Sequence, residues 1–414
     1  MEKKILRVRA ALACTSIILG AGLFSSVARA QEIPESFTPI RPQGMGGAFT
    51  AVANDENAVW TNPAGLARGR KPRSRSTVEL VKVPNIIVGA NTASRDFIQG
   101  VSSNSSANDI SKVAGQAGQL SDKPFWAMSA LFPLMMFDVG SNPSIAGAYS
   151  QTTIQSMVDA DNKTLARTSA ISDVGALYGM SFTDKSHMIS AGVVGRYIAR
   201  FAYEDKIPVD ELKNAKTLQT SIKEGSNKSS GFAVDTGFMW TVADFWYPTL
   251  GVSMLNAPTG CKDDYLNPFS KKRERVCGTV FKGSFENPEA LSTVDPTDVR
   301  LGLSMTPRFS SKLAARIAVD LHHLPITIGQ DHYGLDGIAP LKQLHAGIEF
   351  FVGNPLERSP FTVAMGLSQG YFTFGTTVEI GVVSLEFSTY GRDISSTATP
   401  KEDRRMLLGL SMNF

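Results

Sequence analysis

The sequence predicts an all-β protein, a transmembrane antiparallel β-barrel of about fourteen strands with an N-terminal plug, or hatch, inside its lumen. Three observations favour this fold class. A cleavable export signal begins the chain, and no run of 18 apolar residues follows it. Apolar and polar residues then alternate through the C-terminal half, up to a terminal phenylalanine.

Residues 1–30 have the composition of a secretory signal peptide. Four basic residues precede an apolar stretch at 10–24, and Ala-Arg-Ala at 28–30 matches a processing site, so we expect cleavage after Ala30. A lipoprotein signal ending at Cys14 is the less favoured alternative, because much of the apolar stretch follows that cysteine. Removal of the segment changes 41 Lys+Arg against 38 Asp+Glu to 36 against 37, since five basic residues and one acidic residue leave. This balance does not favour nucleic acid as a partner.

Two cysteines remain after the signal. Cys261 and Cys277 flank the polar stretch KDDYLNPFSKKRERV, which predicts a disulfide within a loop of an exported protein. A zinc site would need further ligands close by, and the stretch contains no histidine. We therefore expect neither a metal nor a cofactor.

The alternation has a period of two, as in β-strands. In DVRLGLSM, Val299, Leu301, Leu303 and Met305 share one face. The opposite faces of this and the following segments combine small residues with acids and bases, which is typical of a polar lumen. A water-soluble β-sandwich is the alternative, since its strands also alternate.

The same pattern assigns strands along the whole mature chain. They are predicted at 76–90, 124–136, 144–158, 167–182, 186–203, 230–243, 248–256, 297–305, 312–322, 342–352, 360–368, 371–380, 381–390 and 404–414. The polar stretches at 94–120, 208–230 and 257–296 are expected to be long extracellular connections. Aromatic residues near the predicted strand ends suit interfacial girdles; these are Trp126, Trp240, Trp246, Tyr247, Tyr371 and Tyr390.

The chain stops at RMLLGLSMNF, in which one face carries Met406, Leu408, Leu410, Met412 and the terminal Phe414. This ending resembles the C-terminal recognition strand of bacterial outer-membrane proteins. The resemblance implies a location in the bacterial outer membrane, contact with its lipid, and recognition of this strand by the barrel assembly machinery.

The stretch GMGGAFTAVANDENAVWTNPAGLA at 44–67 carries a more specific resemblance. It resembles the N-terminal signature of the outer-membrane long-chain fatty-acid transporter (FadL/TodX) superfamily, and IAVDLHHL, LHAGIEFFV and GLSQGYFTFG are similar to its C-terminal half. Residues 31–75 would then be a hatch that plugs the barrel formed by residues 76–414. Hydrophobic substrates in this superfamily pass from an extracellular groove through the lumen and leave sideways into the membrane.

The resemblance implies a function without catalysis: passive passage of hydrophobic small molecules such as long-chain fatty acids. The residues expected along the hatch and substrate path are Gly44, Met45, Gly46, Gly47, Phe49, Trp60, Asn62, Pro63 and Ala64. The alternative is a barrel that does not transport, but anchors or shuttles proteins for a secretion or surface-assembly system. Its partner would be a secreted or surface protein.

Ionisable residues on the predicted lumen faces are expected to form a network of paired charges. They are Arg196, Arg200, Arg300, Arg316, Asp320, His345, Glu349 and Glu379. Residues 366–370 match the hydrolase pattern G-x-S-x-G, but a strand-like segment follows Ser368 where a nucleophile elbow needs a helix. We therefore predict no catalytic residue.

Overall fold

The computed structural model describes residues 35, 37–68, 78–92, 124–158, 164–186, 188–208, 220–222, 224–267, 269–270, 272–284, 293–310, 313–352, 359–394 and 401–414. The predicted signal peptide and the predicted connection at 94–120 lie outside these residues. No helix within the described part is long and apolar enough to cross a membrane.

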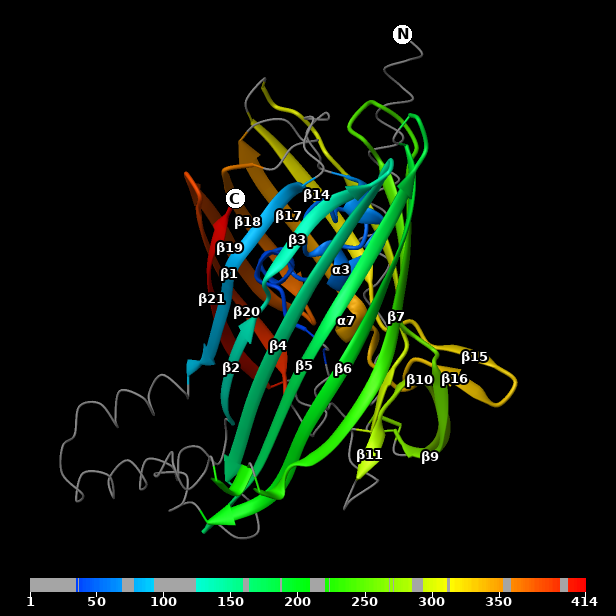
Figure 1. Ribbon diagram of the computed structural model, residues 1–414, viewed down its shortest axis with the longest axis vertical. Helices are drawn as coiled ribbons and strands as arrows, with labels where there is room; N and C mark the ends of the chain where they lie inside the picture. Colours follow the sequence, from blue (N-terminus) through cyan, green and yellow to red (C-terminus); the bar gives the residue numbers. More distant parts are fainter. Residues whose placement is uncertain are drawn as a thin grey trace, which may run out of the picture.

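The described chain forms a closed antiparallel barrel of 14 strands, as the sequence predicts (Figure 1). Its strands are β1 (Val78–Asn91), β2 (Phe125–Leu131) with β3 (Leu134–Val139) as two halves of one wall position, β4 (Asn142–Val158), β5 (Leu165–Thr183), β6 (Ile189–Pro208), β7 (Asn227–Thr241), β8 (Thr249–Ala257), β13 (Asp298–Met305), β14 (Leu313–Leu321), β17 (Leu344–Val352), β18 (Phe361–Ser368), β19 (Tyr371–Ile380), β20 (Val383–Asp393) and β21 (Glu402–Asn413). The ring closes because β21 pairs with β1 and β8 pairs with both β7 and β13.

The two faces of the wall differ as the alternation predicts. Val299, the second residue of β13, is buried, but Leu301 and Leu303 are 41% and 52% exposed on the outer face of this strand. Charged side chains of the inner face are almost fully buried, including Arg196, Glu349 and Asp320. An apolar exterior around a polar interior is the arrangement of a barrel that lies in lipid.

The last strand closes the ring where the sequence predicts it. Leu408 and Leu410 pair with Val88 and Ile86 of β1, and all four side chains are exposed outward. Phe414 exchanges both backbone hydrogen bonds with Val81. Recognition of this strand by an assembly machinery stays a prediction.

The aromatic girdle is only partly present. Trp240 and Trp246 are 43% and 46% exposed, but Trp126 and Tyr390 are buried in the lumen. That expectation was wrong for these two residues because their phase along β2 and β20 turns them inward. The guanidinium of Arg405 lies 4.4 Å from the centroid of the Trp126 ring. The ring therefore contacts a cation in the lumen and not the membrane–water interface.

The wall has uneven height. β5 and β6 contain 19 and 20 residues, whereas β8 and β13 contain 9 and 8. The extra residues of β4 to β7 extend the wall at the end away from Phe414, here called the distal end (Figure 1). β6 continues to Pro208 and β7 begins at Asn227, so the predicted connection at 208–230 is shorter than expected.

A second sheet, here called the side sheet, lies beside the distal end (Figure 1). It contains β9 (Gly260–Leu266), β10 (Arg273–Val280), β12 (Val294–Pro296), β15 (Ile326–Ile328) and β16 (Asp331–Tyr333). β11 (Lys282–Ser284) pairs with β7 of the barrel, and the short helix α7 (Pro340–Gln343) leads into β17. The predicted connection at 257–296 therefore contains strands of its own.

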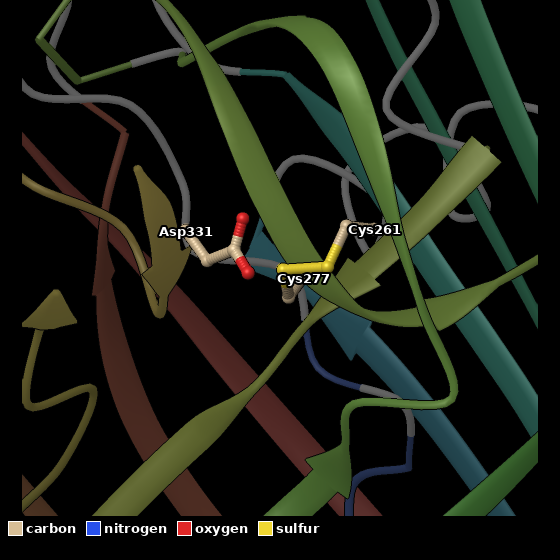
Figure 2. A group of neighbouring side chains, drawn as sticks. All are labelled: Cys261, Cys277 and Asp331. Atoms are coloured by element: carbon tan, nitrogen blue, oxygen red, sulfur yellow. A yellow bond between two sulfur atoms is a disulfide. The ribbon is translucent and has the colours of Figure 1, made fainter. Parts of the chain in front are cut away.

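The predicted disulfide is present in the side sheet. Cys261 and Cys277 are opposite each other in the β9–β10 pair and are bonded, with the carboxylate of Asp331 beside them (Figure 2). The two sulfurs are joined to each other, so they offer no thiolates to a metal. The bond fixes β9 to β10 directly.

We expect replacement of both cysteines by serine to loosen the side sheet and leave the barrel intact. Loss of a cross-link with a sequence separation of 16 removes about 3 kcal/mol on the chain-entropy model. Hydrogen exchange should therefore accelerate at the amides of β9 and β10, while exchange in β18 and β19 serves as the internal control. Faster exchange in both regions would contradict separate stabilisation of the side sheet.

Candidate functional site

The described part of the hatch, residues 37–68, lies within the barrel (Figure 1). It contains α2 (Ile40–Gly44), α3 (Ala58–Thr61) and the 3-10 helix η1 (Pro63–Ala67), and nearly all of its side chains are buried. α2 packs against β19 and β20, and η1 packs against β5, β6 and β7. The hatch therefore follows the inner wall around much of its circumference.

Glycines of the wall let the hatch backbone approach closely. A Cβ added to Gly375 would lie 2.7 Å from the Cα of Gly44, and one added to Gly251 would lie 2.5 Å from the Thr50 carbonyl oxygen. Further wall glycines touch the hatch in the same way; they are Gly366, Gly347, Gly302, Gly237 and Gly192. Within the hatch, Gly46 and Gly47 have φ of 69° and 84°, a backbone region that favours glycine.

Wall side chains hold the first half of the hatch by its backbone. Asp320 accepts hydrogen bonds from the amides of Phe49 and Thr50 at 2.8 and 2.7 Å. His345 donates from Nδ1 to the Gly46 carbonyl at 2.6 Å, and Thr373 donates to the Gly44 carbonyl at 3.0 Å. These bonds satisfy backbone groups that would otherwise be buried without partners.

Asn62 joins the second half of the hatch to the opposite wall. Its Nδ2 donates to the carbonyls of Thr50, Phe238 and Val252 at 2.7, 3.2 and 3.3 Å. Its Oδ1 accepts from the Ala64 amide at 3.1 Å and so caps η1, in which Pro63 is the first residue. The Asn-Pro pair of the signature is thus a helix start that is fixed to β7 and β8.

A buried ionic cluster ties α2 to the wall. Glu349 accepts two hydrogen bonds from Arg41 at 2.7 and 2.6 Å and a third from Arg316 at 2.7 Å. Asp55 accepts a further bond from Arg41 at 2.5 Å. Buried carboxylates and guanidinium groups require partners of this kind because water is excluded. Glu379, another predicted member of the network, lines a small polar pocket beside Arg41.

The other predicted network residues lie on the distal side of the hatch. Arg196 pairs with Asp235 through two bonds at 2.6 and 3.0 Å. Arg200 binds both Asp173 and Asp295, with its shortest contact to Asp295 at 2.6 Å. Arg300 pairs with Asp298. The predicted residues therefore form two groups. One group holds the hatch, and the other lines the cavity on the distal side of the hatch.

That cavity has a volume of about 490 Å³. Arg196, Arg200 and Arg300 line it with their acidic partners, and Phe37 and Trp60 form an apolar part of its lining. The rings of Phe37 and Trp60 stack with centroids 4.3 Å apart, and Phe132 and Tyr149 meet Trp60 edge-on at 5.4 and 5.0 Å. Here these four rings are called the aromatic cluster.

Residues before and after Phe37 in the sequence are fixed to the barrel wall. Glu35 forms an ion pair with Arg392, and the Thr38 amide donates to Gln151 at 3.0 Å. Burial would raise the pKa of the Glu35 carboxyl, but the nearby Arg392 guanidinium holds that pKa below its usual value. Glu35 is therefore charged near neutral pH.

The wall is interrupted next to the aromatic cluster. β2 and β3 are separated at Phe132 and Pro133, and the neighbouring β1 shifts register between Lys82 and Asn85. The Phe132 amide still donates to the Asn85 carbonyl at 2.8 Å, so the interruption remains bonded. Phe132 points inward with 2% exposure.

Sequence reasoning missed several residues of this site. Arg41 carries no alternation signal because it lies in the hatch, and Phe37 precedes the signature at 44–67. Tyr149 could have been found from its inward phase within the strand predicted at 144–158. Phe132 could have been found from the proline that follows it, since proline interrupts sheet hydrogen bonding.

Ser368 of the G-x-S-x-G pattern lies at the end of β18, and the tight turn at Gln369 and Gly370 leads directly into β19. Its hydroxyl is 3.3 Å from His345 Nδ1, which already bonds the Gly46 carbonyl at 2.6 Å. The serine thus has neither the helix of a nucleophile elbow nor a free imidazole nitrogen at this distance.

No family model matches the chain, and no curated protein matches its sequence. Among solved structures, the TodX deltaS2S3 mutant monoaromatic hydrocarbon channel is 11% identical with a TM-score of 0.52, and the match covers 92% of this chain and 99% of that one. The deltaS2 mutant of the same channel is 10% identical with a TM-score of 0.51, covering 91% and 99%. The Pseudomonas putida toluene transporter TodX is 10% identical with a TM-score of 0.49, covering 93% and 99%. The predicted resemblance to FadL-type channels is thereby confirmed at the level of the fold.

Proposed function

We propose that this barrel lies in the bacterial outer membrane and lets hydrophobic small molecules pass through it without chemical change. The observation that carries this proposal is the 490 Å³ cavity lined by Phe37 and Trp60. The Trp60 ring in turn contacts Phe132, at the point where the wall is interrupted. The structural neighbours are described as monoaromatic hydrocarbon channels or a toluene transporter, which agrees with such cargo.

The proposed route has three stages. A ligand enters the cavity from the distal, extracellular end and rests its apolar part on Phe37 and Trp60. A shift of the hatch then separates the ring of Phe37 from that of Trp60. The ligand leaves sideways where β1 and the β2–β3 position are least regular, because fewer ladder bonds have to break there.

The lining of the cavity favours an apolar body with a polar end. Trp60 Nε1 is buried without a hydrogen-bond partner among the described residues, so it has a proton for an acceptor on the ligand. Fatty acids and small oxygenated aromatic compounds both carry such acceptors. We therefore propose that long-chain fatty acids are one class of cargo, to be compared directly with an aromatic hydrocarbon.

The first test is the mass spectrum of apolar molecules retained by the purified protein, followed by uptake of oleic acid or toluene into proteoliposomes. Replacing Asn62 by alanine removes the side-chain amide that donates to the carbonyls of Thr50, Phe238 and Val252, which weakens the attachment of the hatch by about 1–3 kcal/mol. We expect uptake to change severalfold in this variant. Asn57→Ala is the matched control, because the Asn57 side chain bonds only Asp55 within the hatch.

Uptake by wild type and both variants at the rate of protein-free vesicles would refute the transport proposal. An empty lumen together with a stable copurifying protein would instead support the anchoring or shuttling role.

A further inference from the structure

Three possible metal ligands meet in the side sheet, away from the lumen. The nearest ligand atoms of Glu274, His332 and Asp336 all lie within 4.8 Å of one another. His332 Nδ1 is 3.2 Å from Asp336 Oδ2. One imidazole and two carboxylates therefore converge at a partly exposed position on the distal end.

The fold brings these residues together from distant parts of the chain. β10 and β16 run parallel, with Val276 opposite His332. Glu274 is two residues before Val276 and so lies on the same face as His332. Asp336 returns to this face through a turn in which Gly334 and Gly337 have φ of 101° and 82°.

An amide fixes the two carboxylate-bearing segments relative to each other. Nδ2 of Asn267 donates to Glu274 Oε1 at 2.5 Å and to the Asp336 backbone carbonyl at 3.0 Å. Outer contacts of this type orient ligands around protein metal sites. The arrangement is thus supported by a neighbour that is not itself a ligand.

The charges around the three side chains are unbalanced. Elsewhere in the side sheet, Asp263, Asp264 and Asp331 each pair with an arginine, at 3.0, 2.6 and 2.7 Å. Within the described part of the chain, neither Glu274 nor Asp336 forms an ion pair with lysine or arginine. A divalent cation would supply the missing positive charge.

A buried hydroxyl next to the cluster is also unsatisfied. Tyr265 is opposite Glu274 in the β9–β10 pair and is 3% exposed, and its hydroxyl has no hydrogen-bond partner among the described residues.

We propose that Glu274, His332 and Asp336 bind a first-row divalent cation of the Zn²⁺ type. Imidazole nitrogen with carboxylate oxygen suits Zn²⁺, whereas Ca²⁺ and Mg²⁺ prefer oxygen ligands alone. Zinc bonds of about 2.0–2.2 Å place tetrahedral ligands roughly 3.4 Å apart, close to the present His332–Asp336 separation. The carboxylate of Glu274, now within 4.8 Å of the other two ligand atoms, would move closer by up to about 1.4 Å, and water would occupy the fourth position.

The position of Asp336 gives this cation a structural role. Leu335 and Ile338, on either side of Asp336, line the 490 Å³ cavity. A cation bound to Asp336 would hold this lining against β10, which the disulfide already fixes to β9. Binding would therefore brace the wall of the cavity from outside the lumen.

The test uses the full-length, disulfide-intact protein in detergent, without a histidine tag and after treatment with a chelator. Equilibrium dialysis against ZnCl₂, with the metal measured by mass spectrometry, should show one Zn²⁺ per chain. Glu274→Gln, His332→Gln and Asp336→Asn should each weaken binding by at least about tenfold. Asp263→Asn, an arginine-paired carboxylate of the same sheet, should bind as the wild type does.

Co²⁺ provides a second measurement that reports the ligands. Its visible absorption bands should appear with wild type and Asp263→Asn and be lost with His332→Gln, while heat-modifiable migration on gels checks that each barrel is folded. Absence of Zn²⁺ binding up to millimolar concentration, equal binding by the three variants, or preference for CaCl₂ would each overturn the proposal. None of these measurements involves a hydrophobic ligand, so failure of transport would not affect them.

Discussion

Replacing Glu349 by glutamine is expected to lower the free energy of unfolding by about 3–5 kcal/mol, because it leaves two buried guanidinium groups without their shared carboxylate. Arg41 and Arg316 both bond Glu349, whose side chain is fully buried. Glutamine keeps the size of the side chain but loses the charge, and its amide nitrogen would face a guanidinium. Chemical unfolding in detergent micelles, followed by tryptophan fluorescence, measures the change.

Glu204→Gln is the control for the loss of one carboxylate. Glu204 lines the distal cavity, but it is exposed and forms no ion pair within the described residues. Its replacement should change stability by no more than about 0.5 kcal/mol. Equal effects of the two substitutions would show that the cluster around Arg41 does not stabilise the hatch.

Replacing Gly347 by alanine should displace the first half of the hatch. The added Cβ would overlap the carbonyl oxygen and the carbonyl carbon of Met45, and backbone atoms cannot rotate away as a side chain can. Overpacking of this kind costs about 1–3 kcal/mol even where side chains can move. Ala48, which is fully buried, can be replaced by cysteine as a reporter that reacts with a maleimide only when the hatch has moved.

The matched control is Gly195→Ala on the lipid-facing side of β6. A Cβ there would lie 3.3 Å from the end of the Phe232 ring, which is 54% exposed and free to adjust. Labelling of the reporter should rise several-fold in the Gly347 variant and stay at the wild-type level in the Gly195 variant. Equal labelling in both would mean that close approach at Gly347 does not position the hatch.

The barrel wall was predictable because each strand carries its own periodic signal. The alternation of Val299, Leu301 and Leu303 predicts a strand without knowledge of its partners. Strands that are neighbours along the sequence are also usually neighbours in the sheet, as β13 and β14 are. The apolar residues that precede Phe414 predicted the last strand for the same reason. The signature at 44–67 predicted a hatch only through its resemblance to a family.

The side sheet was not predictable from such local signals. Its strands are short, and β10 pairs in parallel with β16, which lies far along the chain. The candidate metal ligands Glu274 and His332 therefore have no characteristic spacing, and the absence of histidine between the cysteines concealed them. Arg41 was missed because nothing in a hatch sequence indicates which wall carboxylate it will meet.

The unequal strand lengths determine where cargo would first be captured. A tilted strand of about ten residues is enough to cross the hydrocarbon of a membrane. β6 has 20 residues, so about ten residues, or about 33 Å of strand at a rise of about 3.3 Å per residue, would extend beyond the lipid. At a tilt of about 45°, this length corresponds to a height of about 23 Å. In the proposed orientation, this one-sided extension of the wall would project into the saccharide layer of the cell surface, where a poorly water-soluble compound would be sheltered from water before it reaches the lipid.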